Sequence, residues 1–139
     1  MNVRNYIRRG KIENEAEGYL ELGMAQQALS ALSRLGDPSE LDSNGSYILG
    51  ESLRSLKRFD EAIEPLRRAA ETATNNIHAL LALGWCYKRI GRLDLAINTL
   101  EQALAVEPGE PLLRYDEPDF NPIRHDPEFQ SLCRKVNGT

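Results

Sequence analysis

One arrangement of residues recurs along the chain every 34 positions, and this repeat restricts the fold more than any other feature of the sequence. The fullest copy lies in residues 77–108, where Leu80 and Leu83 follow helical spacing. Gly84 and Ala96 are small, so this copy predicts two antiparallel helices that approach each other closely. The repeat therefore predicts an array of helix pairs, in which each pair buries its apolar face against the next.

This copy resembles the tetratricopeptide repeat (TPR) motif, with Leu80 where the family usually has tryptophan and Leu100 where it often has phenylalanine. The resemblance implies an all-α fold, an α-solenoid of three TPR helix-turn-helix repeats followed by a C-terminal capping helix. We expect one domain spanning 1–139, with repeats at about 9–42, 43–76 and 77–110 and a cap at 111–139. The earlier copies are seen at Leu49, Gly50, Leu53, Ala62, Leu66 and Ala69, and at Ala16, Tyr19, Gly23, Ala28, Leu32 and Leu35.

Capping and turn residues predict where the helices begin and end. Asp42 or Ser43 is expected to cap the first helix of the second repeat, and Asp60 the second. The basic start of the chain, residues 1–9, is interpreted as a helical extension or frayed start with solvated arginines, in preference to a basic arm for an acidic partner. The predicted helices span about 11–22, 24–35, 44–56, 60–72, 76–90 and 93–106.

The last part of the chain differs in composition, because residues 108–139 contain five of the seven prolines. Asp126 and Pro127 predict the start of a last helix at 127–136. The letters DFNPIRHDPEF are similar to short tails that close many bacterial TPR arrays. We expect this segment to cap the open end of the third repeat. The alternative is that it folds into the binding groove over Trp85.

The titratable residues predict no catalytic, cofactor or metal site. The acidic residues near the C-terminus, such as Asp116 and Asp119, have ordinary roles as helix caps or turn residues, and His125 has no nearby histidine or cysteine partner. The sequence also lacks a glycine-rich phosphate loop and a local nucleophile–base motif. We therefore expect a protein that is not an enzyme, and keep catalysis by the acidic tail only as a remote alternative.

Composition and net charge limit which classes of partner molecule and which cellular compartment we expect for this protein. A net charge of −4 argues against nucleic acid as the main partner, and no apolar run is long enough for a membrane span or a signal peptide. Cys86 and Cys133 are too far apart in sequence for a metal or redox motif. We expect Cys86 to be a buried thiol, and the protein to work in the reducing cytoplasm.

The TPR resemblance implies that the first helix of each repeat lines a concave groove. Such a groove would be acidic near the first repeat and basic near the third, with Tyr47 and Trp85 as apolar anchors for a bound segment. The expected function is binding of a protein or peptide segment of unknown identity. The alternative is a structural role, in which copies associate head to tail. The predicted groove residues are Glu13, Glu17, Glu21, Tyr47, Glu51, Arg54, His78, Leu81, Trp85, Lys88 and Arg89.

Overall fold

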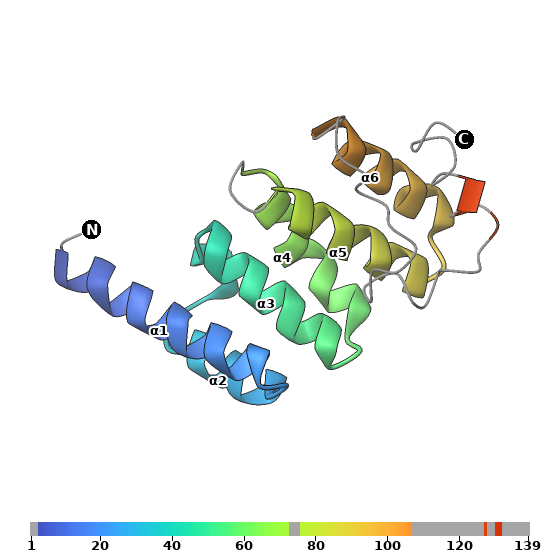
Figure 1. Ribbon diagram of the computed structural model, residues 1–139. Coiled ribbons are helices and arrows are strands. Elements are labelled where there is room, and N and C mark those ends of the chain that lie inside the picture. The colour runs from blue at the N-terminus through green and yellow to red at the C-terminus, as the bar shows by residue number, and fades with distance from the viewer. Residues whose placement is uncertain (1–2, 73–75, 107–126, 128–129, 132–139) are drawn as a thin grey trace.

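The computed structural model describes residues 3–72 and 76–106, together with residues 127, 130 and 131 (Figure 1). Within this part of the chain all regular structure is helical, which confirms the predicted all-α class. The α-helices are α1 (Val3–Glu21), α2 (Ala25–Ser33), α3 (Ser43–Ser55), α4 (Phe59–Ala70), α5 (Asn76–Arg89) and α6 (Leu93–Val106), and the 3₁₀ helix η1 spans Pro38–Glu40.

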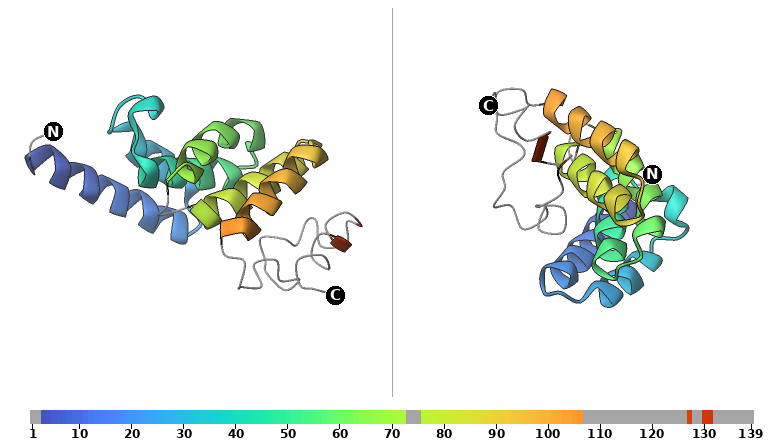
Figure 2. Two further views of the ribbon diagram at one scale, coloured as in Figure 1. Left: turned by 90° about the horizontal axis from the view of Figure 1, so that it is seen from above. Right: turned by 90° about the vertical axis from the view of Figure 1, so that its right-hand side faces the viewer.

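The helices form antiparallel pairs that follow one another along an array (Figure 1 and Figure 2). Helix α1 packs on α2, α3 on α4, and α5 on α6. Packing of α2 on α3 and of α4 on α5 joins each pair to the next. Helix α3 also contacts α1 and α5, so the first helices of the pairs form one layer. This arrangement is the predicted α-solenoid of TPR-type repeats.

Small residues in the first helix of a pair allow the second helix to approach closely. A Cβ atom placed on Gly50 would lie 2.5 Å from Leu66 Cγ, and one on Gly84 would lie 3.0 Å from Leu100 Cγ. Both leucines are almost fully buried. Among the described residues, one group of packed core residues is Ala16, Ala28, Ala31, Leu32 and Ile48, and another is Leu53, Ala62, Leu66, Ala82, Leu83 and Cys86.

The turn inside each helix pair has the same backbone geometry. Gly23, Lys57 and Gly91 occupy equivalent positions and have φ angles of 76°, 62° and 83°. In each turn, the amide of the next residue donates back to a carbonyl of the preceding helix over 2.8 to 2.9 Å. Glycine adopts a positive φ without strain, which explains its use in the first and third turns. The second turn places a lysine in the same conformation.

Several helix boundaries differ from the predictions. Helix α1 begins at Val3, so the basic start of the chain is a helical extension. Asp42 caps α3 as predicted, because its Oδ1 accepts from the Gly45 amide over 2.8 Å. The predicted cap Asp60 is wrong: α4 begins at Phe59, which places Asp60 in the first turn of the helix. The tight turn at Lys57 brings the chain into the helix earlier than expected.

Two further segments bear on the predictions. The connection between α2 and α3 contains the 3₁₀ helix η1, in a stretch where the sequence predicts no helix. The side chain of Asp37 caps this element by accepting from the Ser39 amide over 2.8 Å. The predicted cap at 111–139, including the helix expected at 127–136, lies outside the described residues except for 127, 130 and 131.

Candidate protein-binding surface

The residues predicted to line a groove lie on α1, α3 and α5, the helices that form one layer (Figure 1). All of them except Glu13 are at least partly exposed. Helix α1 carries Glu13, Glu17 and Glu21, α3 carries Tyr47, Glu51 and Arg54, and α5 carries His78, Leu81, Trp85, Lys88 and Arg89.

The structure brings some of these residues together around Trp85. The guanidinium carbons of Arg54 and Arg89 lie 5.1 Å and 5.7 Å from the centroid of the indole ring. Phe59, from the first turn of α4, meets the indole edge-on with 4.8 Å between ring centroids. The Arg89 guanidinium also lies 5.0 Å from the Phe59 ring centroid. We call Arg54, Phe59, Trp85 and Arg89 the Trp85 cluster; its contacts are of the cation–π and edge-to-face kinds.

The two arginines of the Trp85 cluster differ in their surroundings. Arg54 forms an ion pair with Glu51, with nitrogen–oxygen distances of 2.6 Å and 3.1 Å and both side chains largely buried. Arg89 is exposed and has no carboxylate partner among the described residues. Arg89 therefore carries the charge in this cluster that is most available to an incoming carboxylate or carbonyl.

The indole of Trp85 has a buried hydrogen-bond donor. Its Nε1 atom is buried and has no hydrogen-bond partner among the described residues. Native proteins leave few buried donors unpaired, because such a donor costs roughly 1–3 kcal/mol. Tyr47 and Trp85 both pack against the core group that contains Leu53 and Cys86. The two predicted aromatic anchors therefore rest on a common apolar support.

Glu13 has a different environment from the other predicted groove residues. It is only 5% exposed, and its Oε2 accepts from Asn44 Nδ2 over 3.3 Å. Burial is the main cause that raises its pKa to about 7, and hydrogen bonding and repulsion from Asp42 add to the effect. The hydrogen bond from Asn44 and the positive charge of Arg9 lower the pKa of Glu13, but by less. Glu13 thus links α1 to the start of α3 and borders a cavity of about 440 Å³ between these helices.

The other predicted residues are spread along the same layer. Glu17 and Glu21 are exposed on α1, and within the described residues no hydrogen bond or ion pair connects them to the Trp85 cluster. His78 is exposed near the start of α5, Leu81 is half-buried, and Lys88 is half-buried beside Arg89. The acidic side chains thus lie on the first repeat, and the basic ones near the end of α5.

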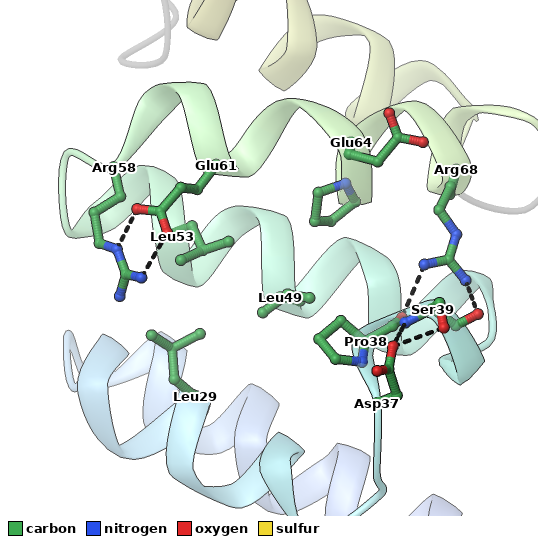
Figure 3. A pocket seen from close by; sticks show the side chains of 11 residues that line it. Leu29, Asp37, Pro38, Ser39, Leu49, Leu53, Arg58, Glu61, Glu64 and Arg68 are labelled. Atoms are coloured by element: carbon green, nitrogen blue, oxygen red, sulfur yellow. Dashed lines mark hydrogen bonds and ion pairs between the residues drawn. The ribbon is translucent and has the colours of Figure 1, made fainter.

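A cavity that the sequence did not predict lies where α2, α3, α4 and η1 meet (Figure 3). It has a volume of about 500 Å³ and an apolar lining that includes Leu29, Leu49 and Leu53. Arg58 and Glu61 form an ion pair on its edge, with distances of 2.6 Å and 2.8 Å. Leu49 and Leu53 lie on α3, which also carries predicted groove residues, whereas the rest of the lining comes from α2, α4 and the segment of η1, which carry none.

Arg68 fixes η1 beside this cavity (Figure 3). Its guanidinium donates to the carbonyl oxygens of Pro38, Ser39 and Leu41 over 2.8 Å, 2.6 Å and 3.2 Å. A guanidinium suits this position because it carries several donors in one plane. One side chain from α4 therefore binds three carbonyl oxygens of the connection between the first two repeats.

Further observations concern chemistry and membranes. Cys86 is a free thiol, fully buried as predicted, and burial raises its pKa to about 12. Within the described part of the chain, no group of histidine, cysteine and acidic residues is placed to hold a metal ion. None of the described helices combines the length and the apolar character needed to span a bilayer.

Comparison with known proteins agrees with the helical array. Two family models, both described as tetratricopeptide repeat, match residues 14–77 and 53–115. The chain is also similar to the anaphase-promoting complex subunit cut9 of Schizosaccharomyces pombe, with 39% identity over 64 residues. This match covers 45% of the present chain but 9% of cut9. With the repeated helix pairs, these matches show that the chain belongs to the tetratricopeptide repeat family, whose repeats serve in general as protein–protein interaction modules.

Proposed function

We propose that this protein binds a segment of another protein on the surface formed by α1, α3 and α5, with the Trp85 cluster as the anchor. The observation that carries the proposal is the position of the Trp85 indole near two guanidinium groups and one aromatic ring. Tryptophan, tyrosine and arginine are the residue types that contribute most to protein interfaces. The protein acts without catalysis in this proposal.

The chemistry of the cluster favours a segment with an apolar side chain beside an acceptor oxygen. The aromatic surface of Trp85 and Tyr47 would hold the apolar side chain. The exposed guanidinium of Arg89 would take a carboxylate or a carbonyl. The indole Nε1, which has no hydrogen-bond partner among the described residues, would gain an acceptor after a small side-chain movement. The similarity to cut9, by name a subunit of a complex, supports a role in holding proteins together.

The experiment uses Trp85 as its own reporter, because it is the single tryptophan of the chain. A displayed library of random peptides is selected on the intact protein, and enriched peptides are titrated while the tryptophan emission is recorded. We expect binding to shift this emission. Arg89→Glu should weaken the binding by roughly tenfold or more, because it replaces attraction by repulsion at the centre of the site.

A matched control separates the site from general effects of charge. Arg67→Glu makes the same charge change on α4, at an exposed residue paired with Glu64. It should leave the affinity within about twofold, because exposed ion pairs contribute little. Equal loss in both variants, or peptides that bind without any change in tryptophan emission, would place the binding surface elsewhere.

The second candidate is head-to-tail association of copies, which the separation of charge among the predicted groove residues favours. Exposed Glu17 and Glu21 lie on the first repeat, while Lys88 and Arg89 lie on the third. Sedimentation at increasing protein concentration distinguishes this candidate. A mass that grows with concentration and falls again in high salt would support self-association. A constant monomer mass would rule it out and leave peptide binding as the remaining candidate function.

A further inference from the structure

The first turns of α1 carry apolar side chains that the other described residues leave exposed. Val3 is 74% exposed, Tyr6 71% and Ile7 50%. This part of α1 lies at one end of the array, with its N-terminal end pointing away from the other helix pairs (Figure 1). Neighbouring apolar side chains that stay exposed together on one element often mark a place where another molecule packs.

Polar contacts hold this part of α1 against the first repeat. Arg8 Nη2 donates to the carbonyl oxygen of Arg34 over 3.1 Å, and Arg9 Nη1 donates to that of Glu40 over 3.5 Å. The acceptors lie just after α2 and at the end of η1. The extension is therefore attached to the fold at its polar side, while its apolar side chains face outward.

A basic cavity lies beside these apolar side chains, between α1 and the end of α2. Its volume is about 370 Å³. All its charged lining residues are basic, and its other lining residues are isoleucines. We call it the basic pocket, and its lining residues are Arg4, Ile7, Arg8, Lys11, Ile12 and Arg34.

Among the described residues, few ion pairs neutralise the positive charge of the basic pocket. Arg34 forms an exposed ion pair with Glu15 at 3.1 Å. Arg8 donates to a carbonyl oxygen, which leaves its charge in place. Within the described residues, neither Arg4 nor Lys11 forms an ion pair. This concentration of positive charge occurs in a protein whose net charge is −4, so it is a local feature that would attract an anionic group.

We propose that the basic pocket binds an acidic segment of a partner protein that also carries an apolar side chain. Carboxylates of the segment would pair with Arg4, Arg8 and Lys11, while its apolar side chain would rest on Ile7 and the neighbouring Tyr6. A protein segment fits better than a nucleic acid or an anionic membrane, because the pocket has isoleucine walls and the rest of the surface repels a polyanion. This surface is separate from the Trp85 cluster, and the proposal stands without it.

The test measures binding of defined peptides to the full chain. One fluorescent peptide repeats glutamate and leucine, and its partner has glutamine in place of every glutamate. We expect the glutamate peptide to bind, with an affinity that falls as salt rises, and the glutamine peptide to bind at least about tenfold more weakly. The double variant Arg4→Glu with Lys11→Glu should lose roughly tenfold or more, because two attractive contacts become repulsive.

The controls keep the result independent of folding. The double variant Arg67→Glu with Arg92→Glu makes the same change of net charge at exposed residues elsewhere and should keep the affinity within about twofold. Arg4→Gln with Lys11→Gln removes the charge without adding repulsion, retains helix-forming residues and should show an intermediate loss. Equal binding by the parent and both pocket variants would overturn the proposal. So would binding of duplex DNA or phosphatidylserine vesicles in place of the glutamate peptide.

Discussion

Gly50 and Leu66 face each other so closely that a side chain on the glycine has no room. A Cβ atom at position 50 would lie 2.5 Å from Leu66 Cγ, a separation that real Cβ atoms essentially never show. Leu66 is fully buried and surrounded by core residues, so it has little freedom to move. The equivalent contact of Gly84 with Leu100 is less tight, at 3.0 Å.

We therefore predict that Gly50→Ala destabilises the protein although alanine is the better helix former. The added methyl group should cost about 1–3 kcal/mol of unfolding free energy through overpacking. Gly84→Ala should cost less, because its contact is longer. Urea unfolding followed by circular dichroism measures both changes.

The control for these substitutions is Gly18→Ala in α1, where a Cβ atom would meet nothing within 4 Å. Here only helix propensity changes, so the variant should gain up to about 1 kcal/mol. If Gly50→Ala were as stable as Gly18→Ala, the contact with Leu66 would not determine the approach of α3 and α4.

Lys57 gives a prediction of the opposite sign. It has a φ of 62° at the position where the other repeats have Gly23 and Gly91. A residue with a Cβ atom pays roughly 1–2 kcal/mol for this backbone conformation. Glycine would remove that cost, but part of the gain would be offset because glycine gives the unfolded chain more conformational freedom. Lys57→Gly should therefore raise the unfolding free energy by about 0.5–1 kcal/mol, as measured by urea unfolding. Lys57→Ala, which retains the Cβ atom, should bring no such gain, and an equal gain in both would assign the effect to the lysine charge.

The register of the repeats could be predicted from the sequence because it is a property of spacing. Gly84 and Leu100 stand 34 positions after Gly50 and Leu66, so one packing rule accounts for both helix pairs. The same rule could not predict Lys57, because a turn position can keep its backbone geometry without its usual glycine. The lysine side chain makes this backbone conformation strained, and the hydrogen bonds of the turn keep the backbone in it.

The candidate site was less predictable because its contacts join different repeats. Trp85 is predicted from the TPR resemblance together with its residue type, but its neighbour Phe59 lies on α4, a helix to which the motif assigns no groove residue. Glu13 is predicted to line the groove, but it is buried and accepts a hydrogen bond from Asn44 of the next repeat. Spacing within one helix predicts which residues share a face of that helix. The contact of Trp85 with Phe59 and the surroundings of Glu13 depend instead on how that face packs against the neighbouring helix pair.

We predict that Arg68 keeps the connection between the first two repeats in a fixed conformation. Its three carbonyl acceptors all belong to residues 38–41. Arg68→Gln removes the charged donors and should cost about 1–2 kcal/mol, because hydrogen bonds to a charged group are stronger than neutral ones. Hydrogen exchange of the amides of residues 39–41 should become faster, while exchange in α5 stays unchanged.

The neighbouring Arg67 supplies the comparison for this change. It is exposed and pairs with Glu64 at 3.1 Å, so Arg67→Gln should change the unfolding free energy by less than about 0.5 kcal/mol. Exchange in 39–41 that stays slow in Arg68→Gln would mean that Asp37 and the turn of η1 hold the segment without the guanidinium.

The raised pKa of Glu13 predicts that the stability of the protein depends on pH. Its pKa is raised from 4.5 to about 7 in the folded protein, first by burial and then by Asp42. Between these values the folded state binds more protons than the unfolded state, so the contribution of Glu13 to stability falls as the pH rises. It is largest below about pH 4.5 and is lost as the carboxyl ionises around pH 7. Other carboxylates also titrate in acid, so this contribution must be isolated by comparison with a variant.

Glu13→Gln isolates it, because glutamine stays neutral, can accept from Asn44 and can donate to Asp42. Above pH 7 we expect this variant to be more stable than the parent by on the order of 1–3 kcal/mol, with the difference shrinking towards pH 5. Urea unfolding at several pH values gives the difference directly. Glu17→Gln makes the same charge change at an exposed position of α1 and should show a small difference that does not vary with pH. A Glu13→Gln difference that is equally constant would show that the buried contact between α1 and α3 tolerates the ionised carboxylate, with Arg9 supplying enough compensation.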